Sequence, residues 1–257
     1  APADGKIAIG NVAGTEFENS LYTMPRSFSA ADVGSVLGIT NATTVGKVSV
    51  VNTKGRLVKF LTTSGSLTIN ESADDSLEAY LTSNDIKSGT YIVYSYGAGG
   101  GGGGTGNTVE HGGGGGGGGG VSRGILNISG TTAYTVGAGG GGGTGSATNA
   151  SNGGNTTIST VIGSGGIGGQ SYNLDYQGGV GGTGDLYNGQ SGTNGSNLYY
   201  SVGAGTGGGL SGGQGVIRSA PGGDGGLASG GGGCCHTNGS AGGDGGDGYI
   251  EIYEWSI

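Results

Sequence analysis

The sequence has little cysteine, proline and tryptophan, and it has no long apolar run. Its 257 residues include 2 cysteines, 3 prolines and 1 tryptophan. The cysteines, Cys234 and Cys235, are adjacent and cannot join distant segments, so a disulfide framework is excluded. No apolar run approaches the roughly 20 residues that cross a membrane, and the first ten residues lack the pattern of a signal peptide. We therefore expect neither membrane insertion nor a signal peptide.

Basic residues are also scarce. The chain has 9 lysines and arginines against 17 acidic residues, which gives a formal charge of −8. A surface this acidic repels phosphate backbones, so we expect no nucleic-acid partner. With 2 histidines, no Ser-His-Asp set and no paired carboxylates, we expect no enzyme. The triplet from Cys234 to His236 is too short to supply four spaced ligands, so we expect no metal and no cofactor.

Glycine is abundant, and its distribution is uneven. Only nine of the 72 glycines precede Gly97, so the sequence predicts a domain boundary there, between residues 1–96 and 97–257. The second part contains neither the G-X-Y period nor the abundant proline of collagen. Its glycine runs lie at 97–106, 112–120, 137–145, 163–169, 178–184, 203–213, 222–226, 230–233 and 242–248.

Residues 1–96 have the pattern of a small, mostly β module. Runs of β-branched or alternating residues predict strands. The expected strands are 47–51, 56–62, 66–69 and 90–96. Two short helices are expected where Ser29–Asp32 and Ser72–Asp75 match the spacing of a capping box. Nothing in this part matches a catalytic set, so it is predicted to be a folded module without chemistry.

The glycine-rich part is open to two interpretations. One is a flexible linker, because glycine loses more conformational entropy on folding than any other residue. The other is a lattice of polyglycine-II (PPII-like) helices. Such helices have three residues per turn and no internal hydrogen bonds, so their backbone groups can pair with close neighbours. The purity of the runs favours the lattice, and so do the apolar segments 90–96 and 248–257 that bracket the region.

The predicted fold class is therefore a small mostly-β N-terminal module, then a polyglycine-II lattice with loops at both ends and a strand-like C-terminus. Specificity is expected in the segments between the runs, because a lattice of glycine cannot discriminate partners. Residues 121–136 are expected to form a structural β-hairpin with an SGTT turn.

Two segments, 170–177 and 185–201, combine tyrosine and leucine with small polar residues, a composition typical of antibody paratopes. Packing of these side chains on the lattice edge is the alternative. Strict alternation of the runs would place the two segments at opposite ends. The candidate receptor-binding residues are Tyr172, Leu174, Asp175, Tyr176, Leu186, Tyr187, Asn188, Asn197, Leu198, Tyr199 and Tyr200.

Three stretches carry a resemblance to a known family. They are TAYTVGAGGGGGTG (132–145), GGNTTI (153–158) and GGDGGDGYIEIY (242–253). Together they resemble the glycine-rich domains at the ends of phage tail fibres. Residues 91–257 are similar to the tip adhesin, or receptor-recognising protein, of T-even-type long tail fibres.

The resemblance implies a virion protein at the extracellular tip of the tail fibre. By this resemblance, loops between polyglycine helices bind a bacterial outer-membrane receptor, either a protein or lipopolysaccharide. Residues 1–90 would attach to the trimeric tail-fibre protein. The alternatives are a structural or capping protein of a fibre or extracellular matrix, and an ice-binding protein.

Overall fold

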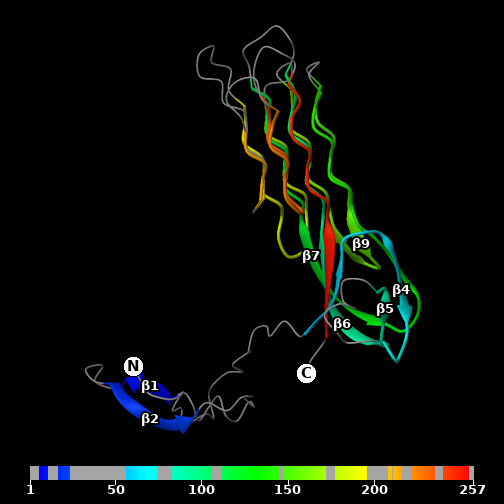
Figure 1. The fold of residues 1–257 in the computed structure, drawn as a ribbon, viewed down its shortest axis with the longest axis vertical. Helices are drawn as coiled ribbons and strands as arrows, with labels where there is room; N and C mark the ends of the chain where they lie inside the picture. Colours follow the sequence, from blue (N-terminus) through cyan, green and yellow to red (C-terminus); the bar gives the residue numbers. More distant parts are fainter. Residues whose placement is uncertain are drawn as a thin grey trace. The chain divides into compact units, whose positions relative to one another are not determined.

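The computed structural model divides into two compact units, Ala1–Thr53 and Lys54–Ile257 (Figure 1). In the first unit, strands β1 (Lys6–Gly10) and β2 (Phe17–Thr23) pair antiparallel. The strand expected at 47–51 and the helix expected at 29–32 lie outside the described residues. The structure describes residues 6–10, 17–23, 56–73, 83–105, 112–144, 148–171, 177–195, 208–209, 211–215, 221–234 and 240–254.

The second unit is mostly β, and the described part of it contains no helix. Its strands are β3 (Leu57–Leu61), β4 (Gly65–Ile69), β5 (Asp85–Ile86), β6 (Gly89–Tyr96), β7 (Val121–Ile128), β8 (Thr132–Thr135), β9 (Thr156–Ile158), β10 (Val161–Gly163) and β11 (Tyr249–Glu254). The strands expected at 56–62, 66–69 and 90–96 are confirmed, and so is the strand-like C-terminal segment. The helix expected from Ser72 onward lies mostly outside the described residues.

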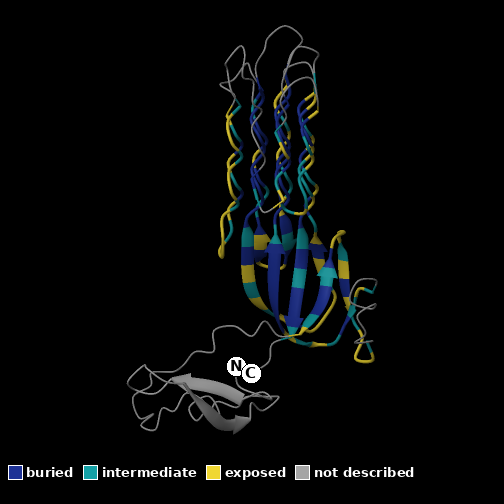
Figure 2. Cartoon of the chain, turned by 60° about the vertical axis from the view of Figure 1, so that its left-hand side comes forward, coloured by how far each residue is buried: buried dark blue, intermediate teal, exposed yellow. Residues whose placement is uncertain are grey.

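Two sheets of this unit face each other across one hydrophobic cluster. Their strand orders are β3-β11-β6-β7 and β10-β9-β8-β4-β5. Val93, Ile250 and Ile252 of the first sheet pack with Leu67 and Ile158 of the second, and all five side chains are essentially inaccessible to solvent. Because successive side chains of a strand point to opposite faces, Tyr94 and Tyr96 of β6 and Tyr253 of β11 lie on the outer face of the first sheet. Figure 2 shows the buried strands below the glycine-rich part.

The predicted hairpin at 121–136 is wrong. Strand β7 pairs with β6, whereas β8 pairs with β4 and β9 in the opposite sheet. Residues 129–131 therefore cross from one sheet to the other. Ile128 and Tyr134 both belong to the shared core, and they reach it from its two sides.

Between β6 and β11, extended segments that form neither helix nor strand run side by side (Figure 1). We call them the glycine array. Its described members are 97–105, 112–120, 137–144, 148–155, 164–171, 177–184, 188–195, 208–209, 211–215, 221–226, 230–234 and 240–248.

Backbone hydrogen bonds in the array rotate among neighbours with a period of three residues. Gly97 donates to Gly120, whereas the next two amides donate to two other segments, 148–155 and 240–248. Gly100 then donates to Gly117, in the same segment as Gly120. Segment 97–105 also accepts bonds from 137–144, 164–171 and 230–234, so it has six neighbouring segments.

Close approach of the backbones excludes side chains from the interior of the array. A methyl group on Gly116 would lie less than 3.0 Å from the carbonyl oxygen of Gly100, and one on Gly102 equally close to that of Gly232. These oxygens belong to hydrogen-bonded backbones that have no room to withdraw. The glycines of the central segments are therefore required by packing.

Side-chain oxygens replace neighbouring carbonyls at the array surface. Asn149, Asn152 and Asn155 accept hydrogen bonds from Ser171, Gly168 and Gly165, at 2.9, 2.9 and 3.0 Å. The acceptors recur every third residue, as the hydrogen-bond rotation requires. The same spacing recurs when Asn188, Ser191 and Asn194 accept from Gly184, Gly181 and Gly178. It recurs again when Asp244 and Asp247 accept from Gly142 and Gly139.

The division between compact units and the change in composition fall at different places. Contacts divide the chain between Thr53 and Lys54, whereas glycine becomes abundant at Gly97. The difference arises because β3 and β6 both pair with β11, the strand that follows the array. The array thus begins and ends on two adjacent strands of one sheet.

Candidate functional site

The array has two ends of different character. Its sheet end joins the strands and carries the turns near Tyr187 and Ala228 (Figure 1). Its far end is remote from the sheets. The described residues that flank the far end are Thr105, Gly112, Thr144, Thr148, Ser171, Gln177, Gly195, Gly215, Pro221, Cys234 and Ser240. Hydrogen bonds such as Gly113 to Cys234 (2.7 Å) and Gln170 to Gln177 (2.9 Å) hold these flanks together.

Three of the predicted site residues lie among the described residues. Leu186, Tyr187 and Asn188 lie at the sheet end, where Tyr187 forms a β-bridge with Val121. The chain then returns to the far end, because 188–195 is itself a segment of the array. The other eight predicted residues lie outside the described residues: Tyr172, Leu174, Asp175, Tyr176, Asn197, Leu198, Tyr199 and Tyr200.

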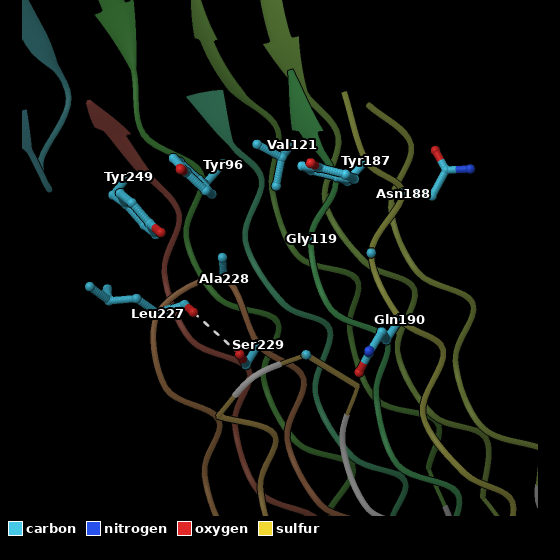
Figure 3. A pocket seen from close by; sticks show the side chains of 12 residues that line it. Tyr96, Gly119, Val121, Tyr187, Asn188, Gln190, Leu227, Ala228, Ser229 and Tyr249 are labelled. Atoms are coloured by element: carbon cyan, nitrogen blue, oxygen red, sulfur yellow. Dashed lines mark hydrogen bonds between the residues drawn. The ribbon is translucent and has the colours of Figure 1, made fainter. Parts of the chain in front are cut away.

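A cavity of about 350 Å³ opens at the sheet end (Figure 3). One wall is a transverse row across the end of the sheet, formed in register by Tyr249, Tyr96, Val121 and Tyr187. The rings of Tyr96 and Tyr249 stack with centroids 4.0 Å apart and planes at 12°. Tyr187 leaves 66% of its surface exposed, so its ring is open to a ligand.

The floor and opposite wall of the cavity come from the array and from the turn that joins its segments 221–226 and 230–234. Gly119 and Ala228 lie at its base, and Leu227 borders it with 48% of its surface exposed. Ala228 has φ of 55°, which turns the chain tightly and presents Leu227 outward. Ser229 Oγ donates to the Leu227 carbonyl at 3.3 Å and accepts from the Ser211 amide at 3.2 Å.

Two side-chain amides border the cavity in different ways. Asn188 directs its amide away from the cavity (Figure 3), and its Oδ1 accepts from the Gly184 amide at 3.2 Å. Gln190 makes no side-chain hydrogen bond to any described residue, whereas its carbonyl accepts from Gly118 at 2.9 Å. The Gln190 amide is therefore a polar group at the cavity that a ligand could use.

The tyrosine wall is electrically neutral. The Tyr96 hydroxyl donates to Glu251 Oε2 at 3.1 Å. Burial, together with the nearby Glu251 carboxylate, raises the pKa of Tyr96 well above its ordinary value. Among the described residues that line the cavity there is no lysine, arginine, aspartate or glutamate. The cavity thus combines aromatic faces with neutral polar groups.

Other features of the described residues are structural. They include no group of three or more histidine, cysteine or acidic residues that could hold a metal ion. A helix able to cross a bilayer is absent from that same part of the chain. Cys234 is buried, and its thiol donates to the Ser240 carbonyl at 2.6 Å.

No protein-family model and no curated protein matches the sequence.

The cavity brings together residues that nothing in the sequence links. Tyr187 and Asn188 are predicted site residues, whereas Tyr96 and Tyr249 belong to the apolar segments expected to bracket the glycine-rich part. Their meeting depends on the pairing of β6 with β11, which joins residues on either side of the whole array. The alternating tyrosines in both strands were the available signal, because one face of each strand must be aromatic.

Proposed function

We propose that the glycine array is a polyglycine-II lattice that serves as the scaffold of a receptor-binding protein. Its segments make their hydrogen bonds to one another, and the acceptor segment changes with a period of three residues. A helix with three residues per turn and no internal hydrogen bonds accounts for both properties. Only glycine fits between the closely packed backbones in the interior of the array, which also supports this assignment.

The protein is a tip adhesin of a phage tail fibre in this proposal, and it binds a bacterial surface receptor without catalysis. The observation that carries the proposal is the convergence of segment ends at the far end of the array. Gly114 accepts from Gly103 and donates to Gln170, and the next amide, Gly115, donates to Thr193. The two flanks of 172–176 and Gly195, the residue that precedes 196–207, are thereby held at the same end of one rigid scaffold, which allows both segments to contact one receptor.

Attachment to the fibre is assigned to residues 1–90, as the resemblance implies. The receptor is an outer-membrane protein or lipopolysaccharide, and the location is the extracellular fibre tip. The acidic charge of −8 supports a partner other than nucleic acid. The pairing of β6 with β11 supports a fixed base for the array, because the first and the last array segments join adjacent strands of one sheet.

Loop replacement on the full chain tests this function. Residues 172–176 and 196–201 would be replaced by glycine-serine segments of equal length, separately and together. A matched control replaces the exposed connection 129–131 between the sheets. Binding of purified, labelled protein would be measured on Gram-negative strains, including strains with truncated lipopolysaccharide or lacking single outer-membrane proteins. We expect the far-end replacements to abolish binding and the control to preserve it.

The alternative functions give different results in the same experiments. A structural or capping protein would show no strain-dependent binding, and its loop replacements would be silent. An ice-binding protein would produce thermal hysteresis in solution. Strain-dependent binding that survives both far-end replacements and is lost on altering residues 1–53 would refute the proposed site.

A further inference from the structure

We propose that the cavity at the sheet end binds a neutral sugar residue. This site is separate from the far end, and the inference does not depend on the fibre-tip function. Its basis is the chemistry of the cavity lining, taken together with its shape.

The aromatic row supplies an apolar wall, in which Tyr96 and Tyr249 stack on each other and Tyr187 offers an exposed ring face. Tyr249, Tyr96 and Tyr187 lie along one edge of the sheet, and the Tyr187 ring is mostly exposed. One side of a pyranose ring presents several C–H groups that pack against an aromatic face.

The polar lining favours hydroxyl groups over charged groups. The Gln190 amide provides both donors and an acceptor, and it makes no hydrogen bond to the described residues. A purely apolar ligand would bury this amide without a partner, which is unfavourable. Sugar hydroxyls both donate and accept, so they satisfy the amide in either orientation.

Charge selects against anionic ligands. The described residues that line the cavity include no basic side chain, and the Glu251 carboxylate lies next to it, at 3.1 Å from the Tyr96 hydroxyl. The chain as a whole carries a formal charge of −8. A sugar acid or a phosphorylated sugar would therefore meet repulsion without a compensating partner.

The size of the cavity fits a small part of a glycan. Its volume of about 350 Å³ falls near the lower limit for small-molecule sites. Glycine backbone at the floor leaves space close to the array, while Leu227 limits the cavity on the side opposite the tyrosines (Figure 3). One or two sugar units of a longer chain are the expected occupants.

Saturation-transfer NMR on the full-length protein tests the site. The probes are the methyl glycosides of galactose, glucose, N-acetylglucosamine and rhamnose, with the methyl glycoside of glucuronic acid as the charged comparison. We expect at least one neutral glycoside to bind in the millimolar range and the glucuronide to bind more weakly. Tyr187→Ala should weaken binding roughly tenfold, because it removes an aromatic contact face.

Two further variants separate ligand contact from loss of fold. Tyr187→Phe keeps the ring and should keep most of the affinity. Val180→Ala removes another exposed side chain, 63% accessible, outside the cavity and should change nothing. The proposal is overturned if no neutral glycoside binds, if Tyr187→Ala binds as well as the parent protein, or if the glucuronide binds as well as the neutral probes.

Discussion

Adjacent glycines in one array segment provide a direct test of the packing argument. A methyl group on Gly140 would lie less than 3.0 Å from the Ser151 carbonyl oxygen and 2.8 Å from the Gly101 amide nitrogen. These two groups form a 3.0 Å hydrogen bond with each other. A methyl group on Gly141 would meet nothing within 4 Å. We therefore expect Gly140→Ala and Gly141→Ala to have opposite effects on stability.

The expected magnitudes follow from the contacts at each position. Gly140→Ala combines overpacking, about 1–3 kcal/mol, with disruption of a buried hydrogen bond, about 1–3 kcal/mol. The free energy of unfolding should fall by about 2–6 kcal/mol. Gly141 lies between Ala138 and Thr144 at the three-residue spacing, and all three positions are exposed. Gly141→Ala should raise the free energy of unfolding by about 0.4–1 kcal/mol, because alanine restricts the unfolded chain.

Thermal unfolding of the full-length variants measures the difference. For a chain of this size 1 kcal/mol corresponds to about 2–4 °C in Tm. Gly140→Ala should thus lower Tm by at least about 4 °C, whereas Gly141→Ala should raise it by about 1–4 °C. Equal destabilisation by both substitutions would mean that the segment tolerates no side chain on any face. Tolerance of Gly140→Ala would mean that its neighbours are not packed as the structure has them.

Three further predictions concern hydrogen bonds and ionisation. Asn152→Ala should lower the free energy of unfolding by about 1 kcal/mol and speed hydrogen exchange at the Gly168 amide, measured by NMR. Asn152→Asp retains the acceptor, so the Gly168 amide should stay protected from exchange. Ser95→Ala should lower the free energy of unfolding, measured by chemical denaturation, by about 1–3 kcal/mol, because the buried Oγ donates to the Thr156 carbonyl and accepts from the Gly163 amide. The exposed control, Ser66→Ala, should lower it by less than about 0.5 kcal/mol. Burial raises the pKa of Tyr96 in the folded protein, so the protonated side chain favours folding. This contribution to the free energy of unfolding is present below about pH 10 and is lost as the pH rises further. Denaturation and ultraviolet titration should show a smaller alkaline loss in Tyr96→Phe; an equal loss in both proteins would exclude Tyr96 as its cause.

Strands were predictable from the sequence, but their partners were not. The runs that became β3, β4, β6 and β11 are rich in β-branched and aromatic residues, and such residues favour a pleated, half-buried surface. The sheet that a strand joins depends on distant segments. Residues 121–136 have the pattern of a hairpin, yet β7 and β8 find better partners in opposite sheets. The tyrosine cavity was missed for the same reason, because its wall requires β6 and β11 to pair.

Two array segments fall between the predicted glycine runs because they contain too little glycine. Segments 148–155 and 188–195 carry asparagine and serine, residues that are common in loops. In both segments these residues recur every third position and accept hydrogen bonds from an adjacent segment. The decisive signal is therefore the three-residue spacing of asparagine and serine, and it was present in the sequence.

This spacing connects the composition of each segment to its place in the array. Segment 112–120 is glycine throughout and exchanges hydrogen bonds with segments on all sides. Segments at the surface have at least one face without a neighbouring backbone, and there a side chain costs nothing in packing. Asparagine, serine or aspartate on such a face also satisfies an amide of the adjacent segment that no carbonyl reaches. Non-glycine residues that recur at every third position of a segment thus mark a face of that segment that lies at the surface.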